Sequence, residues 1–272
     1  MTNVVKTIAT LITGLAALAA PTAAEPATIE APALVQLQAG SFEYWAAGEF
    51  TRDGKPVDAP HATVRIPAPL SIMTHQVTAG EYRRCMADKA CAPLADEHVG
   101  NDLPVVMVSW RDAQDYAAWL SKKTGDHYRL PTDEEWTYAA ASRAPHEVAL
   151  GDADAVARWL AQYNRETQAQ PVDGRPQPVG HFGANENGLL DLAGNVWEWT
   201  DSCYTRAMLD ADGKSVGPQT VNCGVRIAEG RHRAYVSDFI RDPRGGGCAA
   251  GVPPSNLGFR LVRESRRAWS LF

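Results

Sequence analysis

The chain has few cysteines, no cluster of basic residues and, beyond its N-terminal end, no long apolar run. Its 272 residues include five cysteines and carry a formal net charge of -6. Because Lys and Arg form no stripe, nucleic-acid binding is not expected. After residue 24 no segment approaches the roughly 18 apolar residues of a membrane-spanning helix, so we expect no stable membrane insertion. The seven histidines are scattered without an HxxxH pair, which gives no sign of a zinc or histidine-bound iron site.

The N-terminal residues MTNVVKTIATLITGLAALAAPTAA have the pattern of a secretory signal peptide. Lys6 precedes an apolar run, and small residues lead up to Ala24, after which cleavage is expected. A buried helix or an uncleaved anchor is the alternative, but the run is short for a span and no basic cluster follows it. We therefore expect a periplasmic or secreted protein.

Five cysteines in an exported chain favour disulfides over thiol chemistry. Cys85 and Cys91 are six positions apart at the end of an expected helix, and Cys203 and Cys223 bracket a polar, glycine-containing segment. Pairing each with its neighbour predicts two local disulfides. Cys248 is then left as the single unpaired cysteine.

Three helices are predicted by their capping boxes, in which a hydroxyl residue is followed three positions later by an acid. The pairs are Thr78 with Glu81, Ser109 with Asp112, and Thr132 with Glu135. The second helix should place Ala113, Tyr116, Ala117 and Leu120 on one buried face and end near Gly125.

Later in the chain the pattern predicts little helix. A short helix is expected after Gly151 and through Trp159, with turns and short strands beyond Pro171. Early helices and late irregular β structure, without βαβ alternation, indicate an α+β fold with abundant coil.

Four segments in order carry a specific resemblance. They are PVVMVSW (104–110), YRLPTDEEW (128–136), NGLLDLAGNVWEW (187–199) and NLGFR (256–260). Together they resemble the sulfatase-modifying factor family, which includes the formylglycine-generating enzymes and the ergothioneine-synthase-type and pyoverdine-maturation-type proteins. The chain is also similar to accessory proteins encoded beside copper nitrite reductases. The alternative for the LPT and GFR motifs is a scaffold role, GFR being a closing strand whose buried arginine pairs with an acid.

The resemblance implies a domain organisation and a fold. We divide the chain into a signal peptide (1–24), a flexible N-terminal segment (25–33), one sulfatase-modifying-factor-like domain (34–264) and a C-terminal tail (265–272). The implied fold is a complex C-type-lectin-like α+β architecture, rich in coil, with a few short helices and antiparallel strands.

The loop from Asp191 to Glu198 is the strongest metal-site candidate, because its carboxylates are hard oxygen ligands of the kind that calcium prefers. The resemblance implies a structural calcium bound by the side chains of Asp191 and Glu198 and the carbonyls of Gly194 and Val196. The alternative is that both carboxylates accept hydrogen bonds from backbone amides in a tight turn.

A second calcium site of the family would fall near Asn164 and Asp173, although the spacing between the two is shorter here. The family has Asn at the position of Asp191, and the carboxylate adds charge to the first site.

The formylglycine-generating enzymes bind copper through two cysteines shortly before the closing strand, a soft pair suited to Cu(I). The matching stretch here, YVSDFIRDPR (235–244), contains no cysteine, so formylglycine generation is not expected. Cys248, which follows three glycines, and His232 are the remaining catalytic candidates. The alternatives are a small buried hydrophobe for Cys248 and a hydrogen-bonded residue for His232. No copper or iron ligand set is assigned.

Two functions remain open. The first is a maturation factor, or a non-haem metal-dependent oxidoreductase, that acts on an exported protein or a small-molecule substrate. The second is a non-catalytic, lectin-like binding or assembly module with a structural calcium ion.

Overall fold

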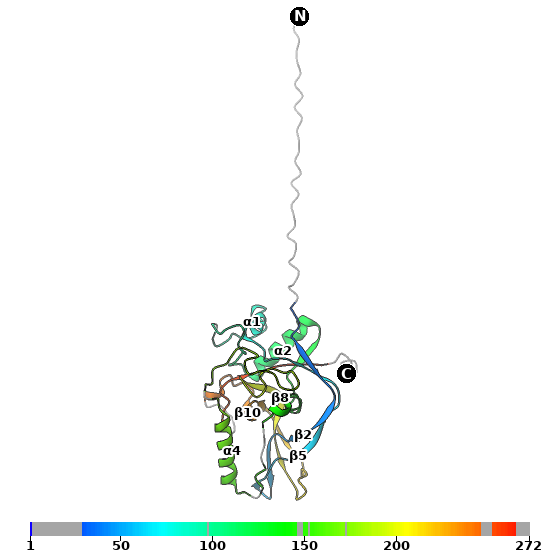
Figure 1. Ribbon diagram of the computed structural model, residues 1–272, viewed down its shortest axis with the longest axis vertical. Coiled ribbons are helices and arrows are strands. Elements are labelled where there is room, and N and C mark those ends of the chain that lie inside the picture. The colour runs from blue at the N-terminus through cyan, green and yellow to red at the C-terminus, as the bar shows by residue number, and fades with distance from the viewer. Residues whose placement is uncertain are drawn as a thin grey trace.

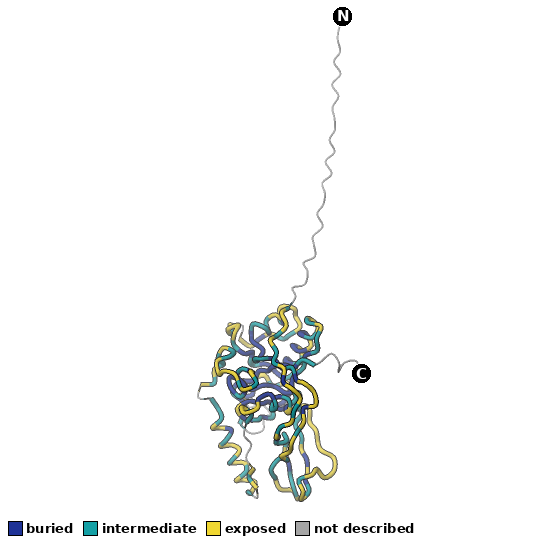
Figure 2. Tube along the Cα trace, turned by 45° about the vertical axis from the view of Figure 1, so that its right-hand side comes forward, coloured by how far each residue is buried: buried dark blue, intermediate teal, exposed yellow. Residues whose placement is uncertain are grey.

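The computed structural model describes residue 1 and residues 29–96, 98–145, 149–151, 153–171, 173–245 and 252–264. The expected signal peptide and C-terminal tail lie outside this part of the chain. Buried residues are concentrated in the upper body of the molecule, while α4 and the β2–β5 pair at its lower end are mostly half-buried or exposed (Figures 1 and 2).

The first sheet joins the two ends of the domain. It has the strand order β1 (Leu34–Leu37), β6 (Leu70–Met73), β12 (Val262–Glu264), β7 (His127–Arg129). All of its pairings are antiparallel. Strand β12, which follows the NLGFR motif, pairs with β6 on one side and with β7 on the other. The C-terminal end of the domain is thereby joined to strands from its N-terminal half.

The second sheet carries the longest strands. Its order is β10 (Ala234–Ser237), β9 (Thr220–Glu229), β8 (Trp197–Met208), β3 (Glu49–Arg52), β4 (Lys55–Pro56), with β11 (Leu257–Gly258) parallel to β8. A separate pair is formed by β2 (Gly40–Trp45) and β5 (His61–Ile66). The expectation of only short strands beyond Pro171 is therefore wrong, since β8 and β9 have 12 and 10 residues. The segment between Cys203 and Cys223 belongs to a long hairpin of β-branched and polar residues.

The helices that were predicted from capping boxes are confirmed. They are α1 (Ala79–Ala87), α2 (Trp110–Thr124) and α3 (Asp133–Ala140), and each has both reciprocal hydrogen bonds of the box at its start. Gly125 ends α2 with a φ of 73°, a left-handed conformation that glycine adopts without strain. Short 3-10 turns occur at Ala141–Arg143 and Pro243–Gly245.

Helix α4 (Ala155–Ala169) is longer than predicted. The sequence from 155 to 169 contains neither Gly nor Pro, so nothing interrupts the helix before Pro171. The Asp154 side chain caps its start by accepting from the Ala157 amide. The prediction that the helix stops at Trp159 is therefore wrong.

The two ends of the domain and its middle meet at one buried ion pair. Arg260 and Glu198 are both fully buried, and the guanidinium donates Nε to Oε2 (2.6 Å) and Nη2 to Oε1 (2.8 Å). The other N–H groups of Arg260 donate to the carbonyls of Met73, Thr74 and Leu190. The expectation that the GFR arginine is buried and paired with an acid is thus confirmed.

None of the helices within the described ranges is long and apolar enough to cross a membrane.

Replacing Arg260 by Met should lower the free energy of unfolding by about 3–5 kcal/mol, because a buried carboxylate loses its ionic partner. Urea denaturation measures this. Arg175→Met is the matched control, since Arg175 pairs with Asp173 in an exposed position and should contribute little. Equal effects of the two substitutions would contradict the role given to the buried pair.

Candidate functional site

A cavity of about 590 Å³ lies between α4, β3 and the segment that leads into β10. Figure 1 shows α4 standing beside the second sheet at the lower end of the molecule, on the side opposite β2 and β5. The wall contains several aromatic rings: Trp45, Phe50, Trp159, Tyr163, Tyr235 and the imidazole of His232. A concave site lined by rings with a few polar groups is typical of small-molecule binding.

The charged side chains of the cavity differ in whether they are paired. Asp58 pairs with Arg158 at 2.7 Å, and Glu49 pairs with Arg206 at 2.7 Å. Arg165 and Arg231 also line the cavity, and neither forms an ion pair with another described residue.

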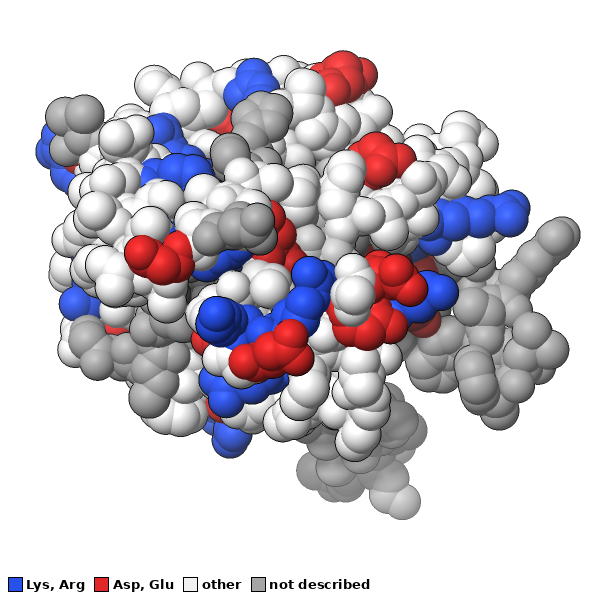
Figure 3. Space-filling model, turned by 90° about the horizontal axis from the view of Figure 1, so that it is seen from below, with Lys and Arg blue, Asp and Glu red and all other residues white. Residues whose placement is uncertain are grey.

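Seen from below, acidic and basic side chains alternate over this end of the molecule, without a broad patch of either sign (Figure 3). The cavity charges without an ionic partner among the described residues are the guanidinium groups of Arg165 and Arg231 and the carboxylate of Glu166, which accepts from Gln162 and from the Val252 amide. An acidic ligand group is what guanidinium groups bind best.

His232, a candidate from the sequence, lies in the wall of this cavity and is buried. Its Nδ1 is 3.0 Å from the carbonyl of Arg233, and its Nε2 is 3.2 Å from Nε2 of Gln170. Since a carbonyl only accepts and an amide N–H only donates, these partners fit the neutral tautomer with its proton on Nδ1. A metal ion at Nε2 would have to displace Gln170.

Behind the cavity wall lies a buried cluster of charged groups. Arg233 donates Nε to Oε1 of Glu229 at 2.5 Å and lies 3.2 Å from Oδ2 of Asp133. Tyr44 donates its hydroxyl to Oδ2 of Asp133. Two carboxylates thus share one guanidinium. Asp133 Oδ1 and Glu229 Oε2 have no hydrogen-bond partner in the described part of the protein.

This cluster favours the protonated form of Glu229. Burial raises the pKa of Glu229 well above its ordinary value, and the Asp133 carboxylate raises it further, while Arg233 opposes the change. Two buried carboxylates close together cannot both ionise cheaply. A protonated Glu229 that donates from Oε2 toward Asp133 Oδ1 would satisfy both orphan oxygens.

The loop from Asp191 to Glu198 is held by protein donors. Oδ2 and Oδ1 of Asp191 accept from the amides of Gly180 (2.5 Å) and Phe182 (2.7 Å), which matches the alternative of a hydrogen-bonded turn. Glu198 accepts from Gln76 and Trp136 at 2.8 Å each, in addition to the two bonds from Arg260.

A carboxylate offers about four acceptor positions, and those of Glu198 are all taken. The adjacent guanidinium would also repel a cation. This arrangement does not fit a calcium ion bound by Glu198. The predicted calcium site of Asp191, Gly194, Val196 and Glu198 would require Glu198 to give up one of these hydrogen bonds in order to bind the ion. Within the described residues, no group of three or more His, Cys, Asp or Glu side chains is placed to hold a metal ion.

The second predicted calcium pair is not organised as a site. Asn164 is an exposed residue of α4, and the carboxylate of Asp173 is engaged by the guanidinium of Arg175 at 2.7 Å. That contact lowers the pKa of Asp173 to about 2.

Both predicted disulfides are present, Cys85–Cys91 and Cys203–Cys223. Cys248 lies outside the described residues. The stretch 235–244, where the copper cysteines of the family would fall, runs directly beside the second disulfide, because the amide of Asp238 donates to the carbonyl of Gly224 at 3.0 Å. This stretch is fixed to α2 by ion pairs from Arg111 to Asp238 (2.9 Å) and from Arg241 to Asp112 (2.7 Å).

Comparison with known proteins agrees with this architecture. A family model described as "Sulfatase-modifying factor enzyme 1-like domain" matches residues 20–265. The chain belongs to this family. The structure of PvdO from Pseudomonas aeruginosa superimposes with a TM-score of 0.56 at 25% identity, covering 86% of this chain and 95% of that one. The predicted family and α+β fold are both confirmed.

Two curated relatives of this sulfatase-modifying-factor-like chain differ in the activity that they are named for. "Inactive C-alpha-formylglycine-generating enzyme 2" of Bos taurus is 36% identical over 171 residues, 57% of this chain and 54% of the relative. The formylglycine-generating enzyme of Streptomyces coelicolor is 31% identical over 173 residues, 60% of this chain and 53% of the relative. The chain thus spans about half the length of these relatives.

Several cavity residues were missed by sequence reasoning. Arg165 lies beyond the predicted end of its helix, Arg231 lies in a region predicted only as turns and short strands, and their lack of carboxylate partners is a tertiary property. Asp133 was read only as part of a helix start. The sequence EGRHR (229–233) was the one signal that could have indicated this site, because an acid is followed closely by three basic residues at the end of a strand.

The raised pKa of Glu229 predicts an unusual pH dependence. Unfolded Glu229 would titrate near about 4.3, whereas the folded group keeps its proton to higher pH. Above about pH 4 the folded state then binds more protons than the unfolded state, so this group lowers stability as pH rises toward the folded pKa.

Glu229→Gln keeps the acceptor for Arg233 and gives Asp133 an N–H donor. We expect a variant at least as stable as the parent at neutral pH, with a shallower loss of stability between about pH 5 and 7. Urea denaturation across this range measures both quantities. Glu43→Gln, which removes an exposed carboxylate, is the control. A Glu229→Gln variant that loses stability at neutral pH and keeps the parental slope would show that Glu229 is ionised.

Proposed function

We propose that this chain is an exported formylglycine-generating-enzyme-like protein that binds an acidic small molecule in the cavity beside α4, as the recognition step of a maturation process. The observation that carries the proposal is the pair of guanidinium groups, Arg165 and Arg231, which line the cavity without carboxylate partners. Aromatic rings beside them provide surface for an apolar or aromatic body of the ligand.

Export is supported by the cysteines. Two disulfides form and persist in an oxidising compartment such as the periplasm or the exterior, and cytosolic proteins seldom keep them. The signal-peptide pattern of residues 1–24 agrees with this location.

A formylglycine-generating reaction is not part of the proposal. Copper chemistry of that kind needs two thiolates, and the disulfides occupy four of the five cysteines. Only Cys248 remains, so no second thiolate is available without reduction. The engaged ring nitrogens of His232 likewise support binding over redox catalysis.

Binding of two matched fluorescent probes tests the proposal. Anilinonaphthalene sulfonate and neutral phenylnaphthylamine share an aromatic body and differ in the acidic group. The double variant Arg165→Gln/Arg231→Gln should weaken binding of the sulfonate by about 10-fold or more, because charge-assisted hydrogen bonds contribute roughly 1.5–3 kcal/mol each. Binding of the neutral probe should change little.

The control variant Arg84→Gln/Lys89→Gln removes the same charge at α1, at the opposite end of the molecule (Figure 1). It should leave both affinities unchanged. Equal weakening of both probes by the cavity variant, or equal effects of the cavity and control variants on the sulfonate, would contradict an acidic-ligand site.

A further inference from the structure

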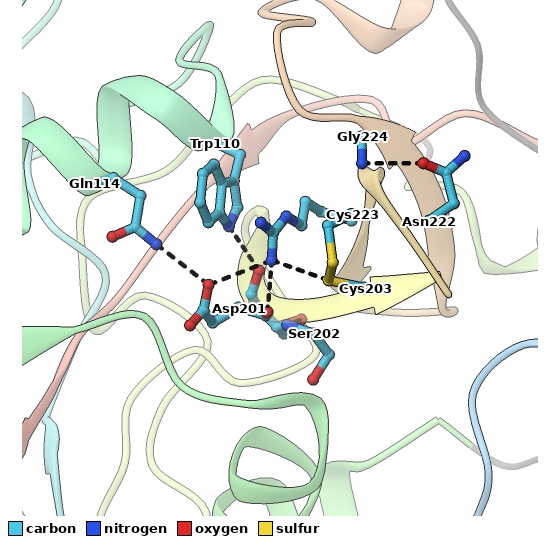
Figure 4. Close-up of a disulfide and its surroundings, with 10 residues drawn as sticks. Trp110, Gln114, Asp201, Ser202, Cys203, Asn222, Cys223 and Gly224 are labelled. Atoms are coloured by element: carbon cyan, nitrogen blue, oxygen red, sulfur yellow. Dashed lines mark hydrogen bonds and ion pairs between the residues drawn. A yellow bond between two sulfur atoms is a disulfide. The ribbon is translucent and has the colours of Figure 1, made fainter. Parts of the chain in front are cut away.

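The disulfide Cys203–Cys223 lies at an irregular point of the β8–β9 hairpin. Along β8, Cys203 is opposite Arg226 and the next residue, Tyr204, is opposite Asn222, so β9 carries three additional residues there. Cys223 is one of these, and it is bonded across the bulge to Cys203 (Figure 4). A bulge takes backbone out of the regular ladder and re-aims side chains.

The two sulfur atoms have different surroundings. Cys223 is exposed, whereas Cys203 is half-buried and accepts a hydrogen bond from Nη1 of Arg226 at 3.3 Å. The other disulfide of the chain is less exposed, because Cys85 is completely buried in the core and Cys91 is half-buried against it. An incoming thiol therefore has access to one sulfur of the hairpin disulfide, and a fixed cation lies at the other.

The position of Arg226 is set by several contacts. Its guanidinium lies over the ring of Trp110, 3.8 Å from the centroid, and Nη1 donates to the carbonyl of Asp201 at 2.7 Å. The same nitrogen is 3.4 Å from the Asp201 carboxylate, which offsets part of the positive charge. Trp110 in turn donates its indole N–H to the carbonyl of Thr200 at 3.0 Å (Figure 4). Arg226 is half-buried, so its charge is screened less than that of an exposed arginine.

We propose that Cys203–Cys223 is a redox-active disulfide that oxidises dithiols of exported polypeptides. The proposal is independent of the ligand cavity. In the first step a substrate thiolate attacks Sγ of Cys223, a bond forms between these two sulfurs, and the Cys203–Cys223 bond breaks. The electron pair leaves on Sγ of Cys203 as a thiolate beside the Arg226 guanidinium, which stabilises it.

In the second step another thiolate of the same substrate attacks the substrate sulfur of the mixed disulfide. The Cys223 thiolate leaves, and the substrate disulfide is complete. Two substrate thiols have lost two protons and two electrons, and the electrons now reside on Cys203 and Cys223 as thiol or thiolate. One turnover therefore consumes only the protein's own disulfide, and no other oxidant takes part.

The neighbouring surface suits an extended polypeptide. Asp238 is joined to the bulge through the carbonyl of Gly224, and the next residue, Phe239, has an exposed fraction of 60%. The exposed ring of this residue, which follows Asp238 in the chain, is available to a substrate chain as an apolar contact.

Reduction kinetics of the intact oxidised protein test the proposal. The protein is treated with a limiting thiol such as reduced glutathione, sampled over time by alkylation, and each disulfide is followed by mass spectrometry. Cys203–Cys223 should react at least about 10-fold faster than Cys85–Cys91, since a stabilised leaving thiolate and an exposed target both speed exchange. Equal rates for the two disulfides would overturn the proposal.

Variants of the positioning residue separate its charge from its packing. Arg226→Gln should slow reduction of the hairpin disulfide by about 10-fold and raise the pKa of the Cys203 thiol, read from the pH profile of its alkylation after reduction. Arg226→Lys should recover part of the rate, and reduction of Cys85–Cys91 should stay constant in both variants. Arg206→Gln, a control on the paired strand β8, should have no effect on either disulfide.

A reduced peptide with two cysteines is the direct substrate probe. One peptide disulfide should form for each oxidised chain, with loss of Cys203–Cys223. Failure of the peptide to oxidise, or identical rates in Arg226→Gln and Arg206→Gln, would show that the disulfide is only structural. Because neither readout involves the cavity, these outcomes are distinct from failure of the ligand-binding proposal.

Discussion

The buried pair of Glu198 and Arg260 connects the parts of the chain that carry the rest of the structure. Glu198 is the second residue of the long strand β8, and Arg260 lies between β11 and β12 near the C-terminal end of the domain. Through Trp136 and the carbonyl of Met73, the same contacts reach α3 and β6. A buried pair of this kind requires full hydrogen bonding, because an unpaired charge in the interior costs several kcal/mol. All four acceptor positions of the acid are filled here, which fixes the relative positions of these elements.

Both proposed sites are built on this scaffold, at separate places along the β8–β9 hairpin. The strand end at Glu229 contributes to the buried acid pair behind the ligand cavity, and the bulge near Cys223 presents the disulfide. The hairpin disulfide lies beside the stretch that would carry the copper cysteines of the family. A cysteine pair is therefore present in this region, but it is bonded, comes from different strands and has a guanidinium as its neighbour.

Local signals predicted much of the fold. The three capping boxes depend on residues three positions apart, and the buried arginine was expected from the GFR motif, so sequence was sufficient for both. The predicted length of α4 was too short because only its first apolar residues were taken as helical. The length of β8 was not predicted because many of its residues are polar. The cavity arginines, the raised pKa of Glu229 beside Asp133 and the contact of Arg226 with Cys203 all require segments that are distant in sequence to meet in the fold. The calcium loop shows the same limit, since only the fold reveals that Arg260 occupies the acceptors of Glu198.

This member of the sulfatase-modifying factor family keeps the scaffold, and we infer that it has no pair of free thiols for copper. The number of free thiols in the native exported protein tests it most directly. Alkylation of the unreduced protein under denaturing conditions, followed by peptide mass spectrometry, should place one label per chain, on Cys248. Two labelled cysteines in the same chain would contradict the account.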